Sequence, residues 1–245
     1  MSLRATSLGL FLAATLQMGQ TASAGLLAES TRVIYEADQH QHSLVLANVN
    51  PYPVVVQTWM DQGGGDPDQA HAPFIVLPAV FRLEPQAIGS LRIIHNGDAL
   101  PQDRESVFWL NLYEIPPTDG EEPLAQAQLT LTMNTQLKVF YRPARLSSGP
   151  DDVASRLRFA LHQQDGQWLL RCVNPTPYHA SFSRISLEAA GQSLPVQQEM
   201  DMMTGPFTER LYQLGPDSPA ARAKVRFNLI DDAGFPVLHE ASLTP

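Results

Sequence analysis

The sequence predicts an all-β protein made of two β-sandwich domains. Short segments in which apolar and polar residues alternate recur along the chain, and clusters of proline, glycine and asparagine separate them. No regular helical segments lie between them, which indicates antiparallel sandwiches or barrels. The 245 residues provide room for two domains of roughly 100 residues each.

The first half of the chain ends in its longest predicted strand. The strands before it are expected at 43–49, 54–60, 90–96 and 106–115, with NPYP, DQGGGDPD, LEPQAIG and PPTDGEEP among the breakers. The long strand, LTLTMNTQLKVFYRP at 129–143, carries an apolar row that begins with Leu129, Leu131 and Met133. Lys138 is the one lysine on its polar face, and a role in the core does not explain that cation.

A second cluster of breakers, RPARLSSGPDD at 142–152, divides the chain. Further strands are predicted at RLRFAL, QWLLRCV, ASFSRISL, QSLPV, RLYQL and KVRFNLI, followed by a hairpin-like DDAGFPVLHE. Only EEPLAQAQL and DDVASRLRFAL have room for a turn or two of helix. We therefore expect one domain at 25–144 and the other at 147–245.

The first 24 residues predict a secretory signal peptide. Arg4 precedes an apolar stretch from Leu8 to Leu16, and Ala22 and Ala24 form an A-x-A site, so we expect cleavage after Ala24. The alternative is an N-terminal membrane anchor, but this apolar run is far below the ~20 residues that cross a bilayer. We expect the mature protein to be exported and soluble.

Charge and cysteine usage narrow the function classes. A net charge of −9 argues against a nucleic-acid binder, which is usually basic with its cations on one face. The single cysteine, Cys172, excludes an intramolecular disulfide, so stability must come from core packing. Cys172 is either a reactive nucleophile or a small buried apolar side chain on a strand, and the second reading is the expected one.

Catalytic and cofactor motifs are absent from the sequence, including G-x-S-x-G, H-E-x-x-H, Walker A and G-x-G-x-x-G. His40 and His42 are a candidate metal pair, but a third ligand is missing nearby and a solvated turn explains them better. Asp231 and Asp232 form either a paired-carboxylate site or part of a hairpin turn. We expect a protein that is not an enzyme and uses no cofactor or metal.

Six segments, in matching order and spacing, resemble the PapD-like periplasmic pilus assembly chaperones of the chaperone–usher pathway. They are 30–59, 81–94, 100–117, 137–143, 174–182 and 231–240. The resemblance implies two immunoglobulin-like domains in an L or boomerang arrangement with a cleft between them. It also implies a periplasmic protein that binds, folds and caps pilin subunits by donor-strand complementation and delivers them to an outer-membrane usher.

The resemblance also assigns residues to the binding of the subunit. Arg32 of TRVIY and Lys138 of QLKVFYRP match the family's two cations that hold the C-terminal carboxylate of the subunit. Leu129, Leu131 and Met133 match the donor residues that enter the apolar groove of the subunit. The alternative for these three is that they face the protein's own core.

A family ion network between the domains matches Glu105, Arg142 and Asp231, with Asp232 as the competing choice for the third member. Pro53 aligns with a family proline for which a cis peptide bond is an open alternative. The sequence departs from the PapD-type pattern in a longer connection after residue 117 and in lacking a second-domain cysteine pair. The missing pair removes the disulfide of those relatives but does not affect the expected fold.

Two other function classes stay open: a pilus structural subunit or adhesin, and a secreted β-sandwich binding protein. The C-terminal LHEASLTP lacks the aromatic and glycine positions of a subunit strand, and Trp59, Trp109 and Trp168 lie on separate predicted strands. An exposed apolar edge strand is an aggregation hazard. We therefore expect the free protein to shield LTLTM, either by self-association or by the TDGEEP segment.

Overall fold

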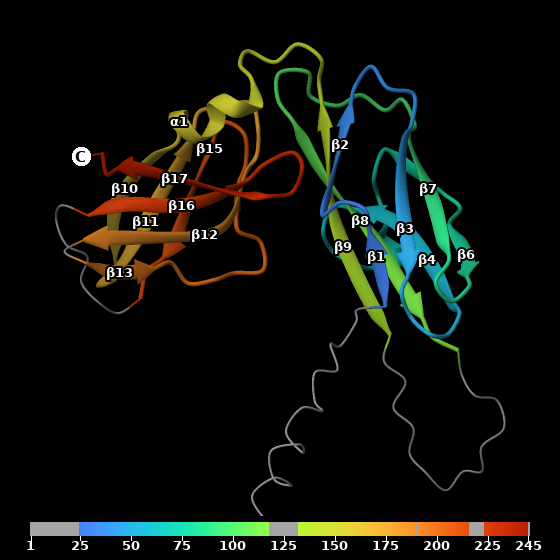
Figure 1. Cartoon of the computed structure of the whole chain (residues 1–245). Coiled ribbons are helices and arrows are strands. Elements are labelled where there is room, and N and C mark those ends of the chain that lie inside the picture. Colours follow the sequence, from blue (N-terminus) through green and yellow to red (C-terminus); the bar gives the residue numbers. More distant parts are fainter. Residues whose placement is uncertain (1–24, 118–131, 190, 216–222, 245) are drawn as a thin grey trace, which may run out of the picture.

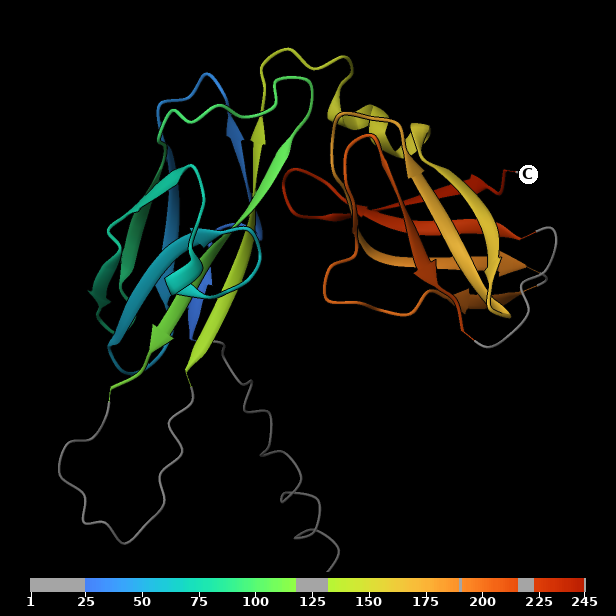
Figure 2. The same cartoon turned by 180° about the vertical axis from the view of Figure 1, so that it is seen from behind.

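The computed structural model describes residues 25–117, 132–189, 191–215 and 223–244, and each structural statement below concerns these residues. Two β-rich domains lie side by side and are joined at one end by the chain around 143–153 (Figure 1). Strands β2 (Arg32–Glu36) and β9 (Met133–Arg142) lie on the side of the N-terminal domain that faces the C-terminal domain, also when seen from behind (Figure 2). The predicted all-β, two-domain fold is confirmed, while the predicted signal peptide at 1–24 lies outside the described residues.

The N-terminal domain is a sandwich of two sheets, with strand orders β2-β9-β8-β4-β6 and β1-β3-β7-β5. Alternate side chains of both sheets fill its core, where Leu46, Leu91 and Leu110 are fully buried. Its other elements are β1 (Leu26–Ala28), β3 (His42–Asn48), β4 (Val54–Asp61), the 3-10 turn η1 (Pro67–Gln69), β5 (Phe74–Leu77), β6 (Val80–Leu83), β7 (Ile88–His95) and β8 (Ser106–Ile115).

The C-terminal domain has a second sandwich and a separate core, which contains Phe159, Leu170, Tyr212 and Phe227. One sheet has the order β10-β11-β15; the other has the order β13-β12-β16-β17, and β14 also pairs with β12. The elements are η2 (Pro150–Asp152), α1 (Val153–Arg156), β10 (Arg158–Gln164), β11 (Gln167–Asn174), β12 (Ala180–Ala189), β13 (Gln192–Pro195), β14 (Met203–Thr204), β15 (Thr208–Gln213), β16 (Lys224–Ile230) and β17 (Pro236–Ser242).

Two local predictions have clear outcomes. Cys172 is fully buried in the second core, and burial raises the pKa of its thiol to about 12, so the thiolate that would act as a nucleophile is scarce at neutral pH. The reading of Cys172 as a buried side chain is confirmed. Among the described residues the cis peptide bond is Leu77–Pro78, so the bond before Pro53 is trans.

The two halves of β9 have different neighbours. Strand β8 pairs with β9 antiparallel from Met133 to Tyr141, whereas β2 pairs with the other side in parallel and only from Lys138 to Arg142. Within the described part of the chain, that side of β9 therefore has no partner strand from Met133 to Leu137. Leu137 is buried in the core, but Met133 on the same face is 51% exposed because the row runs past the end of the sandwich.

Candidate functional site

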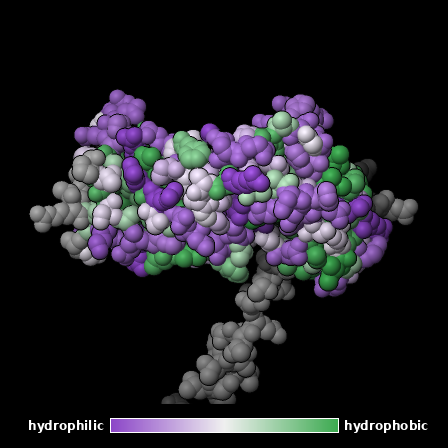
Figure 3. All heavy atoms as spheres, turned by 90° about the horizontal axis from the view of Figure 1, so that it is seen from above, coloured by the Kyte–Doolittle hydropathy of each residue, from purple (hydrophilic) through white to green (hydrophobic). Residues whose placement is uncertain are grey.

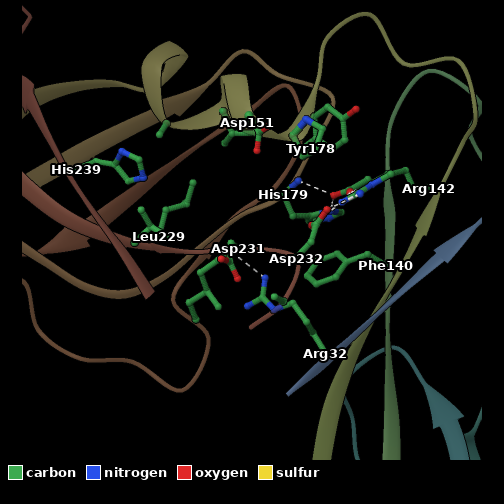
Figure 4. Close-up of a pocket in the computed structure, with 17 residues that line it drawn as sticks. Arg32, Phe140, Arg142, Asp151, Tyr178, His179, Leu229, Asp231, Asp232 and His239 are labelled. Atoms are coloured by element: carbon green, nitrogen blue, oxygen red, sulfur yellow. Dashed lines mark hydrogen bonds and ion pairs between the residues drawn. The ribbon is translucent and has the colours of Figure 1, made fainter. Parts of the chain in front are cut away.

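A cleft of about 560 Å³ lies between the two domains. The close-up shows Arg32, Phe140 and Arg142 entering it from the N-terminal domain, opposite Leu229 and Asp231 of the C-terminal domain (Figure 4). The remaining lining residues are Glu105, Pro150, Asp151, Val153, Ala154, Tyr178, His179, Ile230, Asp232, Ala233, Val237 and His239. Seen from above, hydrophilic side chains cover much of the middle of the molecule, and apolar ones gather toward the outer end of the N-terminal domain (Figure 3). The cleft itself is lined both by charged side chains, such as Arg32 and Asp232, and by apolar ones, such as Phe140 and Leu229.

Strands β2 and β9 bring Arg32 and Lys138 together. The two residues are Cα partners on adjacent parallel strands, so their side chains leave the same face of the sheet. That face is directed at the C-terminal domain, because Arg32 bonds to Ile230 and Lys138 pairs with Asp201 there. The two cations that the sequence places 106 positions apart are therefore neighbours in space.

The Arg32 guanidinium is buried and incompletely satisfied. Its side chain lies over the Phe140 ring, 5.5 Å from the ring centroid, and Nη1 donates to the Ile230 carbonyl oxygen at 3.1 Å. Its Nε is buried and has no hydrogen-bond partner among the residues that the structure describes. Burial lowers the pKa of Arg32, and the charges of Asp232, Asp231 and Glu105 oppose that shift. A buried guanidinium with a donor to spare suits an anionic ligand.

Lys138 has a partner that the sequence did not predict. Its Nζ lies 2.7 Å from Oδ1 of Asp201 in the C-terminal domain. The Lys138 side chain is 22% exposed and that of Asp201 is 43% exposed, so water reaches the pair. The second cation of the predicted anchor is therefore present but already neutralised by an internal carboxylate.

Arg142 joins the two domains through two carboxylates. Its Nε donates to Glu105 at 2.9 Å, and its two terminal nitrogens donate to both oxygens of Asp232 at 2.7 and 2.8 Å. The third member of the network is thus Asp232, and the prediction of Asp231 was wrong. Asp231 instead stabilises the turn after β16, where its carboxylate accepts the N–H of Phe235 at 2.8 Å.

His179 also contacts this network, although nothing in the sequence pattern marked it. Its backbone N–H and its Nδ1 lie 2.8 and 3.1 Å from Oε2 of Glu105. Burial alone would lower the pKa of Arg142, but the hydrogen bonds and charges of Asp232 and Glu105 outweigh that effect and raise it. Arg142 therefore stays charged, and Glu105, whose side chain is 2% exposed, is held by partners from both domains.

The other predicted site residues either lie away from the cleft or fall outside the residues that the structure describes. Leu129 and Leu131 fall among the residues that are not described, and Met133 is the first residue of β9. His40 lies in a bend and His42 begins β3; no group of three or more His, Cys, Asp or Glu in the described ranges is arranged to hold a metal ion. None of the helices in those ranges has the length and apolar character to cross a membrane.

Two family models together match both domains of the chain. The N-terminal domain of the pili and flagellar-assembly chaperone PapD matches residues 25–147, and the C-terminal domain of the pili assembly chaperone PapD matches residues 152–241. The probable fimbrial chaperone YadV of Escherichia coli strain K12 is 35% identical over 225 residues, covering 90% of each chain.

Solved structures agree with these matches. The structure of the YadV chaperone has a TM-score of 0.77 at 32% identity, covering 90% of this chain and all of that one (100%). The complex of the Salmonella enterica SafA pilin with the SafB chaperone gives a TM-score of 0.74 at 28% identity, covering 91% of this chain and 98% of the matched one. The chain belongs to the PapD family of pili assembly chaperones.

Proposed function

We propose that this protein binds, folds and caps pilin subunits in the periplasm by donor-strand complementation and delivers them to an outer-membrane usher. The similarity to fimbrial chaperones, one of them solved in complex with a pilin, supports the proposal. The main observation behind it is the edge of β9 that has no partner strand among the described residues and that ends at Arg32 and Lys138. We also infer export by the signal peptide, with cleavage after Ala24.

The register of β2 against β9 determines which end of a guest strand reaches the cations. A guest strand that pairs with β9 along Met133–Leu137 in parallel continues the line of β2, which begins opposite Lys138. Its chain must therefore stop near Arg32, and its C-terminal carboxylate arrives between the two cations. An antiparallel guest would bring its amino terminus there instead, where like charges repel. The geometry thus favours a parallel strand with a free carboxyl end.

The two cations suit that carboxylate in different ways. The guanidinium of Arg32 offers a planar fork of donors, and the Lys138 ammonium supplies a compact charge. Because Arg32 is 8% exposed, its bonds to the carboxylate are screened less than bonds in bulk water. Docking of the carboxylate also fixes the register of the guest strand, since main-chain hydrogen bonds alone specify register weakly.

The apolar row of the donor strand supplies the rest of the binding energy. Met133 points beyond the home core, and we propose that Leu129 and Leu131 extend the same row into the groove of the subunit. Fully burying each such side chain contributes roughly 1.5–3 kcal/mol. The Glu105–Arg142–Asp232 network then keeps the domain bearing β9 and the domain closing the cleft in one relative position.

Co-expression of a pilin with this protein tests the function. We expect a soluble one-to-one complex, whereas the pilin expressed alone aggregates or is degraded because its groove is unfilled. The matched control is the same pilin carrying its missing strand as a C-terminal fusion, which should stay soluble and leave the protein unbound. Binding of both pilin forms alike would contradict donor-strand complementation.

We further propose that the free protein self-associates through the β9 edge, since an unpaired strand edge favours such contacts. Sedimentation velocity of the free protein and of its pilin complex checks this. We expect dimers or larger species of the free protein at micromolar concentration, and a one-to-one complex with the pilin. A free monomer over the whole concentration range would show that the edge is covered by other means.

A further inference from the structure

We infer that the Asp201 carboxylate takes the place of the subunit's terminal carboxylate in the free protein. It forms an ion pair with Lys138 there and is displaced when a subunit docks. This inference rests on the proposed function, because it concerns the same cation. It assigns to the C-terminal domain a direct role in setting the affinity for the carboxyl terminus.

The first support is the position of Asp201. It lies between β13 and β14, in a segment attached to its own domain at both ends. Gln197 donates its backbone N–H to the Gln213 carbonyl at 2.7 Å, and the Met202 carbonyl accepts from the N–H of Phe182 at 2.7 Å. Between these attachments Met200 is fully exposed, and Asp201 reaches Lys138 of the other domain. The segment therefore presents the Asp201 carboxylate to Lys138 from a fixed base.

The second support is the contrast between the two cations. Among the described residues Arg32 forms no ion pair: its guanidinium donates to the neutral carbonyl oxygen of Ile230, although the charges of Asp232, Asp231 and Glu105 are near enough to affect its pKa. Lys138 already contacts a carboxylate at 2.7 Å, the short distance of a charge-assisted hydrogen bond. Docking at Lys138 is therefore an exchange of one carboxylate for another, and the net gain is smaller than that of filling an empty site.

The third support is that the displaced carboxylate has a second partner. Oδ2 of Asp201 lies 3.8 Å from Nη1 of Arg210, whose Nη2 is held by Glu199 at 2.6 Å. Asp201 is also 43% exposed, so water can solvate it once Lys138 turns away. Release of Asp201 thus leaves no buried, unpaired charge, which is the condition for an exchange at low cost.

The exchange favours ligands that bring more than a charge. A small free anion that replaces Asp201 at Lys138 gains no further binding energy. A strand terminus also forms main-chain hydrogen bonds along β9 and accepts a hydrogen bond from Arg32. The pair therefore keeps Lys138 neutralised until a strand with a free carboxyl end arrives.

The test compares Asp201→Asn with the wild-type protein. The probe is the C-terminal strand peptide of a pilin that forms a complex with the wild-type protein, made as the free acid and as the C-terminal amide. We expect Asp201→Asn to bind the acid about two- to fivefold more tightly, the scale of a partly exposed ion pair, and the amide with unchanged affinity. Equal or weaker binding of the acid overturns the inference.

Two controls make the result specific. Glu209→Gln removes the same charge from an exposed pair with Arg171 in the same domain and should leave both affinities unchanged. Asp201→Asn in a Lys138→Met background should also have no effect, because the partner is gone. If the wild-type protein binds acid and amide alike, the anchor in the proposed function fails; if it prefers the acid but Asp201→Asn does not strengthen binding, only the inference about Asp201 fails.

Discussion

Arg142→Met is expected to lower the free energy of unfolding by about 3–5 kcal/mol, the cost of removing one partner from a buried ion pair. The change leaves the Glu105 carboxylate, which is 2% exposed, without its guanidinium and removes both bonds to Asp232. Urea denaturation followed by tryptophan fluorescence measures this loss. Methionine is similar in length and apolar character to the aliphatic part of the arginine side chain. The loss of stability therefore reports the guanidinium charge and its hydrogen bonds.

The matched control for that change is Arg171→Met. Arg171 pairs with Glu209 on the surface, where both side chains are about half exposed (45% and 53%). Exposed pairs contribute ~0–1 kcal/mol, so this variant should unfold close to the wild type. Equal losses in the two variants would show that the interdomain network does not stabilise the protein.

The largest functional effect is expected from Arg32→Ala and Lys138→Ala. Each change removes one donor group of the carboxylate anchor, and a hydrogen bond to a charged group contributes about 1.5–3 kcal/mol. Capture should therefore weaken roughly 10- to 100-fold in Arg32→Ala, and less in Lys138→Ala, because Lys138 gives up its pair with Asp201 when the carboxylate binds. Thermal unfolding should change little, because Arg32 bonds a carbonyl and Lys138 pairs with a partly exposed carboxylate. Co-purification of the pilin from co-expressing cells measures capture.

Arg82→Ala is the control for these two variants. Arg82 is an exposed cation of the same domain, paired with Glu84 on a strand away from the cleft. It should retain the pilin at the wild-type level. If either anchor variant also co-purifies normally with the pilin, the assignment of the anchor is wrong.

The elements of the fold were largely predictable because the alternation of apolar and polar residues is a local signal. The predicted strands at 54–60 and 106–115 agree closely with β4 and β8. The short strands β5 and β6 were not predicted, since each has four residues and lies between closely spaced prolines. Which strands pair, and that β2 lies parallel to only half of β9, depends on contacts distant in sequence.

The residues of the candidate site that belong to a recognisable family motif were predictable from the sequence. Arg32 and Lys138 were found through the family resemblance, because alternation alone does not distinguish an anchor from a surface charge. Asp231 was chosen over Asp232 because adjacent residues in a turn give no sequence signal for which side chain faces the other domain. Asp201 lies in a segment without a motif, and its contact with Lys138 depends on how the two domains meet.

The central claim is that the free carboxyl terminus of a pilin strand, parallel to β9, binds between Arg32 and Lys138. A crystal structure of the complex with a pilin tests it most directly. The account predicts main-chain pairing along Met133–Leu137, terminal carboxylate oxygens within about 2.7–3.2 Å of nitrogens of both cations, and Asp201 released from Lys138. A guest strand that runs antiparallel to β9, or a carboxyl terminus bound elsewhere while Lys138 still contacts Asp201, would contradict it.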